Sequence, residues 1–297
     1  SYRQSIDLRP SAETQLEIPL TALVPGSNTL EIYSEGELVA QESFINWDIP
    51  AWDTTYEEVV LAPYFNSLVT DIFENKYLSP RPERVTLQLP TQGIGNWCYP
   101  LVKALIDDSG LRAIAGAKDV IFTPQGIPLQ TPSSAHKKNI AFVSQWDNYP
   151  TTMTIPISGK SSHMYVLMAG TTNPMQSRFT NGELQVTYSD GTSEILLLKN
   201  PENWWPIEQD YYIDGYAFTT DAPKPPRVYL KTGEITRDFT DFTPIKGFSD
   251  FVVDGGAATL LDIPLDQSKD LKSLQLKAIA NDVIIGIMSI TLIKGNE

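Results

Sequence analysis

The fold of this chain is decided by the stretch Glu183–Lys199, which reads ELQVTYSDGTSEILLLK. Apolar residues alternate with polar ones over Leu184–Tyr188, which is the period of a strand with one buried face. Asp190-Gly191 then supplies a tight turn that needs a positive φ, and Ser193–Lys199 returns. The stretch therefore predicts a β-hairpin.

The rest of the chain repeats this kind of pattern. Short strand-like runs are separated by Gly, Pro, Asn and Asp, which indicates an all-β fold, a sandwich or jelly roll. Two short helices are also expected, one over Tyr64–Phe73 from its apolar spacing and one over Leu101–Ile106. The expected strands are Gln4–Leu8, Thr14–Pro19, Asn28–Tyr33, Leu38–Ile45, Asn139–Ser144, Met153–Ile157, Met164–Ala169, Arg227–Leu230, Leu260–Ile263, Ser273–Ala278 and Val283–Ile293.

A domain boundary is expected at Asp48–Thr54, which divides residues 1–50 from residues 51–297. Four short strands in the first part bury too little apolar surface to form a sandwich alone. This part is therefore expected to be a fragment of an immunoglobulin-like or similar sandwich, or an extra sheet. The second part is expected to be the jelly-roll domain.

Composition excludes several classes of function. The net charge is −14, and such a chain repels nucleic acid and anionic membranes. Cys98 is the only cysteine, so neither a disulfide framework nor a thiolate zinc site is expected. No apolar run is long enough to span a membrane, and no signal peptide is visible. We expect the chain to be a mature or excised piece of a longer protein.

The hairpin leads into Asn200–Tyr212, NPENWWPIEQDYY, the most aromatic part of the chain. Paired indoles are either core wedges or platforms on which a sugar ring stacks. Neighbouring residues in extended chain point to opposite sides, so one of Trp204 and Trp205 could lie in the core and the other in solvent. Burial of both indoles, as a plug between sheets or domains, is an equal alternative. On a binding platform, Asn203, Glu208 and Asp210 would supply hydrogen bonds to a polyol.

Two other segments contain candidate ligand-binding residues. Asp108 and Arg112 could form a sugar clamp, although a buried Arg–Asp pair that fixes a loop is the favoured alternative. A structural Ca²⁺ ion is a further alternative, but the spacing matches no known calcium loop. Arg178 and Gln176 follow a core strand, where binding residues concentrate.

Several motifs together resemble galactose-binding-like jelly-roll modules attached to glycoside hydrolases of gut Bacteroidetes. These motifs are Pro124–Leu129, Met153–Lys160, Tyr165–Thr172 and Tyr188–Thr192. Three segments, Gln92–Cys98, Asp107–Arg112 and Asn200–Tyr212, resemble more narrowly an uncharacterised C-terminal family on such enzymes. The resemblance covers roughly residues 55–295. It implies a jelly-roll fold, secretion to the periplasm or cell surface, and association with glycans, but no catalytic residue.

The leading hypothesis is a noncatalytic accessory module that supports a glycoside hydrolase domain and contacts carbohydrate, without a cofactor or a metal. An alternative is that the module contributes a loop or carboxylate to the cleft of that domain. A third is a structural spacer with every aromatic side chain buried. Pairs such as Glu208 with Asp210 carry no weight as catalytic carboxylates, because 36 acidic residues make such pairs inevitable.

Overall fold

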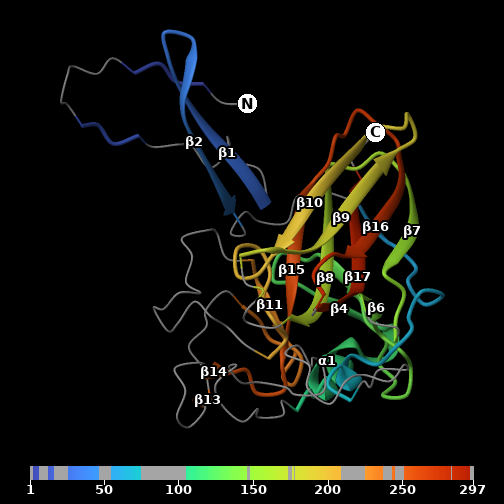
Figure 1. Cartoon of the computed structure of the whole chain (residues 1–297). Coiled ribbons are helices and arrows are strands. Elements are labelled where there is room, and N and C mark those ends of the chain that lie inside the picture. The colour runs from blue at the N-terminus through green and yellow to red at the C-terminus, as the bar shows by residue number, and fades with distance from the viewer. Residues whose placement is uncertain are drawn as a thin grey trace.

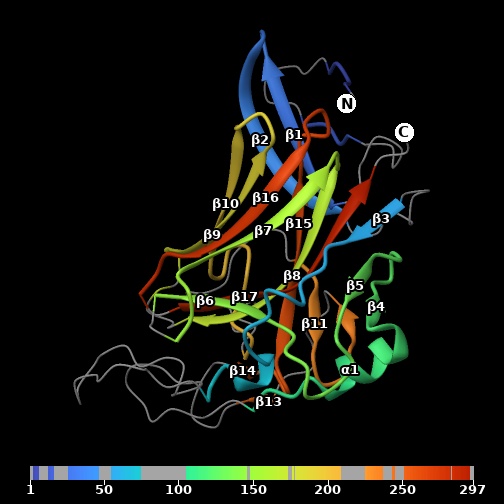
Figure 2. The same ribbon diagram turned by 90° about the vertical axis from the view of Figure 1, so that its right-hand side faces the viewer.

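The computed structural model describes residues 3–6, 13–16, 26–46, 55–74, 105–145, 148–172, 176, 178–208, 225–236, 243–244, 251–281 and 283–294. Two antiparallel sheets pack face to face in a β-sandwich (Figure 1). The expected all-β class is confirmed. Figure 2 shows β10 (Ser193–Lys199) of the smaller sheet on the left and β3 (Thr55–Glu58) of the larger sheet on the right.

The smaller sheet has four strands and contains the predicted hairpin. Its order is β10 (Ser193–Lys199), β9 (Thr180–Tyr188), β16 (Leu271–Ala278) and β7 (Thr152–Gly159). At the hairpin turn, the Asp190 carboxylate accepts hydrogen bonds from the backbone and hydroxyl of Thr192, and Gly191 has a φ of 88°. Aspartate and glycine thus both serve the turn, as the sequence predicted.

The larger sheet has seven strands. Its order is β12 (Ile235–Thr236), β11 (Arg227–Tyr229), β15 (Ala257–Pro264), β8 (His163–Thr172), β17 (Val283–Lys294) and β3 (Thr55–Glu58), while β6 (Ala141–Ser144) also pairs with β17. Successive strands β7, β8 and β9 alternate between the sheets, as do β15, β16 and β17. These crossings join the two sheets into one sandwich.

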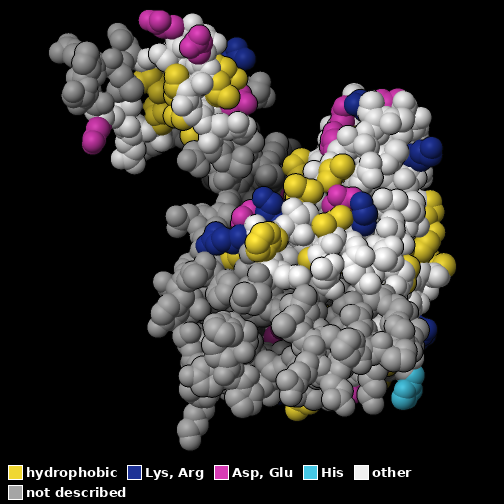
Figure 3. All heavy atoms as spheres, viewed as in Figure 1, with side chains coloured by type: hydrophobic (Ala, Val, Ile, Leu, Met, Phe, Trp, Pro, Cys, Tyr) yellow, Lys and Arg dark blue, Asp and Glu magenta, His cyan; other side chains and the backbone are white. Residues whose placement is uncertain are grey.

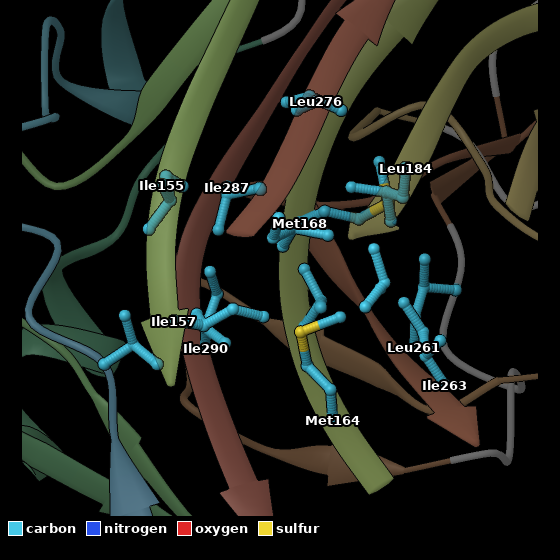
Figure 4. Close-up of a cluster of buried hydrophobic side chains, with 14 of the residues drawn as sticks. Ile155, Ile157, Met164, Met168, Leu184, Leu261, Ile263, Leu276, Ile287 and Ile290 are labelled. Atoms are coloured by element: carbon cyan, nitrogen blue, oxygen red, sulfur yellow. The ribbon is translucent and has the colours of Figure 1, made fainter. Parts of the chain in front are cut away.

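The core between the sheets is aliphatic (Figure 4). Met164 and Met168 of β8 point into it together with Ile287 and Ile290 of β17, and Leu184 of β9 faces them. A register shift between Ile287 and Ser289 lets both isoleucines face the same side. Each such side chain contributes about 1.5–3 kcal/mol when it is fully buried.

A second core covers the opposite face of the seven-stranded sheet. It includes residues of the helix α1 (Ser109–Ala115) and the 3₁₀ helix η2 (Val69–Asp71), and of β4 (Val120–Phe122) and β5 (Pro128–Gln130). A further 3₁₀ turn, η3 (Gly116–Lys118), follows α1. Because both faces of the sheet are covered, nearly every residue of β8 and β17 is buried.

The prediction of a helix over Tyr64–Phe73 is wrong, since only the three residues of η2 within this range are helical. Tertiary pairing overrides the helical spacing here, because the backbone N–H of Asn66 donates to Ile140 O. The Asn66 amide also exchanges two hydrogen bonds with the backbone of Phe142 in β6. The second expected helix is not present at residues 105–106, and residues 101–104 lie outside the described chain. Helix α1 begins just after it, where the sequence suggested a turn.

A two-stranded hairpin, β1 (Gly26–Ser34) and β2 (Glu37–Asn46), precedes the sandwich (Figure 1). Both strands and their turn agree with the sequence prediction. Residues 4–6 and 14–16 form no strand, and the remainder of those two predicted strands and the Asp48–Thr54 boundary lie largely outside the described residues. A short pair, β13 (Thr243–Pro244) and β14 (Phe251–Val252), completes the described strands.

Replacing Gly286 with alanine should destabilise the protein by about 1–3 kcal/mol, because the added methyl group would overpack the space between β17 and its neighbours. A Cβ at this position in β17 would lie 2.7 Å from side-chain atoms of both Ile140 and Phe142. Chemical denaturation would measure the loss of stability. Ser158→Ala, at the exposed end of β7, is the control and should change the free energy of unfolding by less than about 0.5 kcal/mol. An equally stable Gly286→Ala protein would contradict the close approach of β6 to β17.

Candidate functional site

Both tryptophans of the aromatic segment are buried, each with 1% of its surface exposed. Trp204 belongs to the core between the sheets, and Ile207 belongs to the second core. The segment is therefore a wedge that reaches both cores. Of the two alternatives, the structure has both indoles buried, and neither Trp204 nor Trp205 offers a stacking surface in this structure.

Asn203, which the sequence suggested as a polyol contact, instead covers the edge of β10. Its side-chain oxygen accepts from Lys199 N at 2.9 Å, and its side-chain nitrogen donates to Leu197 O at 2.7 Å. Its backbone N–H donates to Lys199 O. These bonds satisfy edge groups that would otherwise be open to pairing with another chain.

Arg227, which the sequence did not point to, binds the aromatic segment through hydrogen bonds and a cation–π contact. Its side chain is completely buried, and the guanidinium carbon lies 5.8 Å from the centre of the Trp205 ring. The guanidinium donates to Trp205 O, to Pro206 O at 2.9 Å and to Thr259 Oγ1 at 2.7 Å. A buried guanidinium needs such acceptors, and the backbone of the wedge supplies two of them.

Glu208 ends the wedge, and its carboxyl points inward. Thr171 Oγ1 donates to Glu208 Oε1 at 2.8 Å, whereas Glu208 Oε2 has no hydrogen-bond partner. Burial raises the pKa of Glu208 to about 7, although the Thr171 hydrogen bond and the Arg227 charge both lower it. The predicted surface ligand is thus an interior acid. Asp210 lies outside the described residues.

Asp108 and Arg112 form the buried ion pair that was the favoured alternative. Arg112 Nε donates to Asp108 Oδ2 at 2.8 Å across one turn at the start of α1. The remaining guanidinium donors reach the carbonyl oxygens of Pro132, Ser134 and Lys137. Arg112 therefore fixes the loop before β6, and its donors are occupied by protein, which excludes the sugar clamp.

Asn139 extends this buried network. Its side-chain nitrogen donates to Asp108 Oδ2 at 2.7 Å, and its side-chain oxygen accepts from Val69 N at 2.9 Å. Helix α1 and η2 are thereby joined through one carboxylate and one amide. Polar side chains that act in this way hold the second core together.

Arg178 is an exposed residue on the loop between β8 and β9, with a φ of 63°. Its backbone N–H donates to Asn200 O at 2.6 Å, which brings this loop beside the start of the wedge. Gln176 is half-buried, and its carbonyl oxygen accepts from the side chain of Asn181. Of the predicted ligand residues within the described chain, Arg178 is the one that faces solvent.

Asp262 is a second interior acid, which the sequence analysis missed. It stands opposite Tyr165 in the β15–β8 register, and both of its carboxyl oxygens are buried without a hydrogen-bond partner. Burial raises the pKa of Asp262 to about 8, and the nearby Tyr165 hydroxyl, outside hydrogen-bond geometry, offsets part of this rise. A lone acidic residue inside the apolar run Leu260–Ile263 was the signal that could have found it.

The two interior acids do not form a catalytic pair. Their neighbours Thr171 and Tyr165 lie six residues apart along β8, which corresponds to about 20 Å. The two carboxyls of a glycoside hydrolase stand only about 5–10 Å apart. Across the described ranges, no group of three or more His, Cys, Asp or Glu side chains is arranged to hold a metal ion.

No model of a protein family matches the chain, and no match was found among curated proteins. None of the helices in the described parts of the chain is long and apolar enough to cross a membrane.

Replacing Arg112 with alanine should cost about 3–5 kcal/mol of stability, because it strands the buried Asp108 carboxylate and three carbonyl oxygens. Urea denaturation would measure the loss. Lys137→Ala is the matched control, since it removes only the exposed 3.4 Å pair with Asp119 and should cost less than about 1 kcal/mol. Similar losses in both variants would contradict the role assigned to the buried pair.

Stability should fall as the pH rises from about 5 to 8. The pKa of Asp262 is higher in the folded chain than in the unfolded chain, so the folded state binds more protons over this range. Asp262 alone would contribute a slope of up to about 1.4 kcal/mol per pH unit. Asp262→Asn should flatten the dependence measured by denaturation at several pH values. Asp254→Asn, a change at an exposed carboxyl, should leave it unchanged.

Proposed function

We propose that this chain is a noncatalytic β-sandwich module of a secreted glycoside hydrolase and that it supports the catalytic domain beside it. The burial of Trp204 and Trp205 carries the proposal, because the most distinctive element of the sequence serves packing. The inward Glu208 adds support, since this carboxyl is not presented to the cleft of a neighbouring domain. The link to glycoside hydrolases rests on the resemblance of the sequence motifs.

Carbohydrate contact, as part of this proposal, is assigned to the outer face of the four-stranded sheet. Four side chains lie opposite one another across the strands in the middle of this face. Their order from β10 to β7 is Ile195, Gln185, Gln275 and Thr154, so that two amides stand between an apolar side chain and a hydroxyl. Gln275 Nε2 donates to Thr154 Oγ1 at 3.2 Å. The neighbouring row contains Leu197, Glu183, Lys277 and Thr152.

The chemistry of this outer face suits a neutral glycan. Lys277 and Glu183 neutralise each other at 3.2 Å, and the face over β9, β16 and β7 is mainly uncharged (Figure 3). Amides and hydroxyls both donate to and accept from sugar hydroxyls. Exposed Ile195 and Leu197 at the edge offer apolar contact to the C–H faces of a sugar ring. On a chain of net charge −14, such a face favours neutral ligands.

Affinity electrophoresis in gels that contain neutral plant or host glycans would test carbohydrate contact. We expect retardation of the native chain without a change in tryptophan emission on binding, because the strands of this sheet contain no tryptophan. The double variant Gln185→Ala, Gln275→Ala should bind about tenfold more weakly, since it loses two hydrogen-bonding groups. Thr236→Ala, outside this sheet, is the control. Lack of retardation by any glycan would overturn carbohydrate contact.

Removal of the module from its parent enzyme would test the supporting role. The proposal expects a lower melting temperature with unchanged kcat on a short soluble substrate. Lost activity in an enzyme whose catalytic domain stays folded would contradict it and favour a contribution to the cleft.

A further inference from the structure

Backbone hydrogen bonds join the described carboxyl end of the aromatic segment to the seven-stranded sheet. We call residues 204–208 the Trp clasp. Its backbone joins β8 where Ile207 N donates to Gly170 O at 2.7 Å, and it joins β15 where Ala257 N donates to Ile207 O at 2.8 Å. Val253 N donates to Glu208 O at 2.9 Å. The Trp clasp thus closes over one end of the sheet.

Two polar groups of the closed clasp are unsatisfied. Trp204 Nε1 and Glu208 Oε2 are buried without a hydrogen-bond partner. Each such group costs stability, because water would pair with it in an open state. A segment with this kind of deficit opens more readily than the strands beneath it.

Among the described residues, three groups favour the ionised Glu208 carboxyl, namely the Thr171 hydroxyl, the backbone N–H of Glu208 itself and the Arg227 charge, and burial outweighs them. From β8, Thr171 supplies one hydroxyl donor and no charge. From β11, the charge of Arg227 reaches the carboxyl, but its guanidinium donates hydrogen bonds to Trp205 O, Pro206 O and Thr259 Oγ1. Val253 contacts Glu208 through its backbone N–H, which donates to the Glu208 backbone oxygen and not to the carboxyl. An ionised carboxylate in this place pays a large desolvation cost.

We propose that the Trp clasp is a proton-operated latch, closed while Glu208 carries its proton and opened when the proton passes to solvent. Opening lets the carboxylate and the Trp204 indole N–H regain water. It also withdraws Asn203 from β10 and so frees the edge groups of Leu197 and Lys199. The pKa of Glu208, raised by burial to about 7, places the change near neutrality. The latch does not depend on the proposed function.

Tryptophan emission and acrylamide quenching between pH 5 and 9 would test the latch. We expect a red shift and increased quenching above neutral pH, with the far-UV circular dichroism retained. Glu208→Gln, which cannot ionise, should keep the emission of the acidic form throughout.

Two further variants keep the test decisive. Asp262→Asn removes the other interior acid and should leave the emission change in place, which separates the latch from the general effect of pH on stability. Thr171→Val removes the hydrogen bond that favours the ionised carboxylate and should open further at the same alkaline pH. The proposal is overturned if folded wild type shows no change, if Glu208→Gln changes as wild type does, or if folded Thr171→Val matches wild type.

Discussion

The seven-stranded sheet is buried on both faces, and the rest of the structure follows from that constraint. Strands β8 and β17 lie between two aliphatic cores, one shared with the four-stranded sheet and one with α1 and its neighbours. Side chains on both faces of these strands must therefore be packed, and glycine is required where β6 approaches β17 at Gly286. The register shift in β17 serves the same double packing.

Polar groups inside such a sheet are tolerated where they organise the layers around it. Arg112 ties α1 to the loop before β6, and Arg227 ties the Trp clasp to β11 and β15. Both guanidiniums are surrounded by carbonyl oxygens, which desolvated cations require. Glu208 and Asp262 lack such compensation, and so each holds its proton near neutral pH. Among the described residues, the interior thus contains two fixed cations, the Asp108 carboxylate paired with one of them, and two proton-dependent acids.

This division bears on function. The aromatic residues expected to meet a ligand support the fold, while the exposed outer face of the smaller sheet is regular and nearly neutral. A module of this kind matches the supporting role that we propose, and it leaves carbohydrate contact to a flat surface of amides and hydroxyls. The proposed latch adds a second state, in which the indoles and the edge of β10 meet solvent.

The sequence by itself determined the elements whose signals are local. Strand alternation and the Asp-Gly turn predicted the β9–β10 hairpin, and short apolar runs predicted β15, β16 and β17, because period and turn chemistry act within a few residues. Tertiary structure decided the rest. The hydrogen-bond partners of Asn66 and Glu208, and the carbonyl oxygens that accept from Arg112, lie 20 or more residues away in the chain, so they could not be read locally. Only the Asp108–Arg112 pair, four residues apart, was within reach of the sequence. Whether Trp204 faced core or solvent depended on which sheets met around it, and that is set by long-range packing.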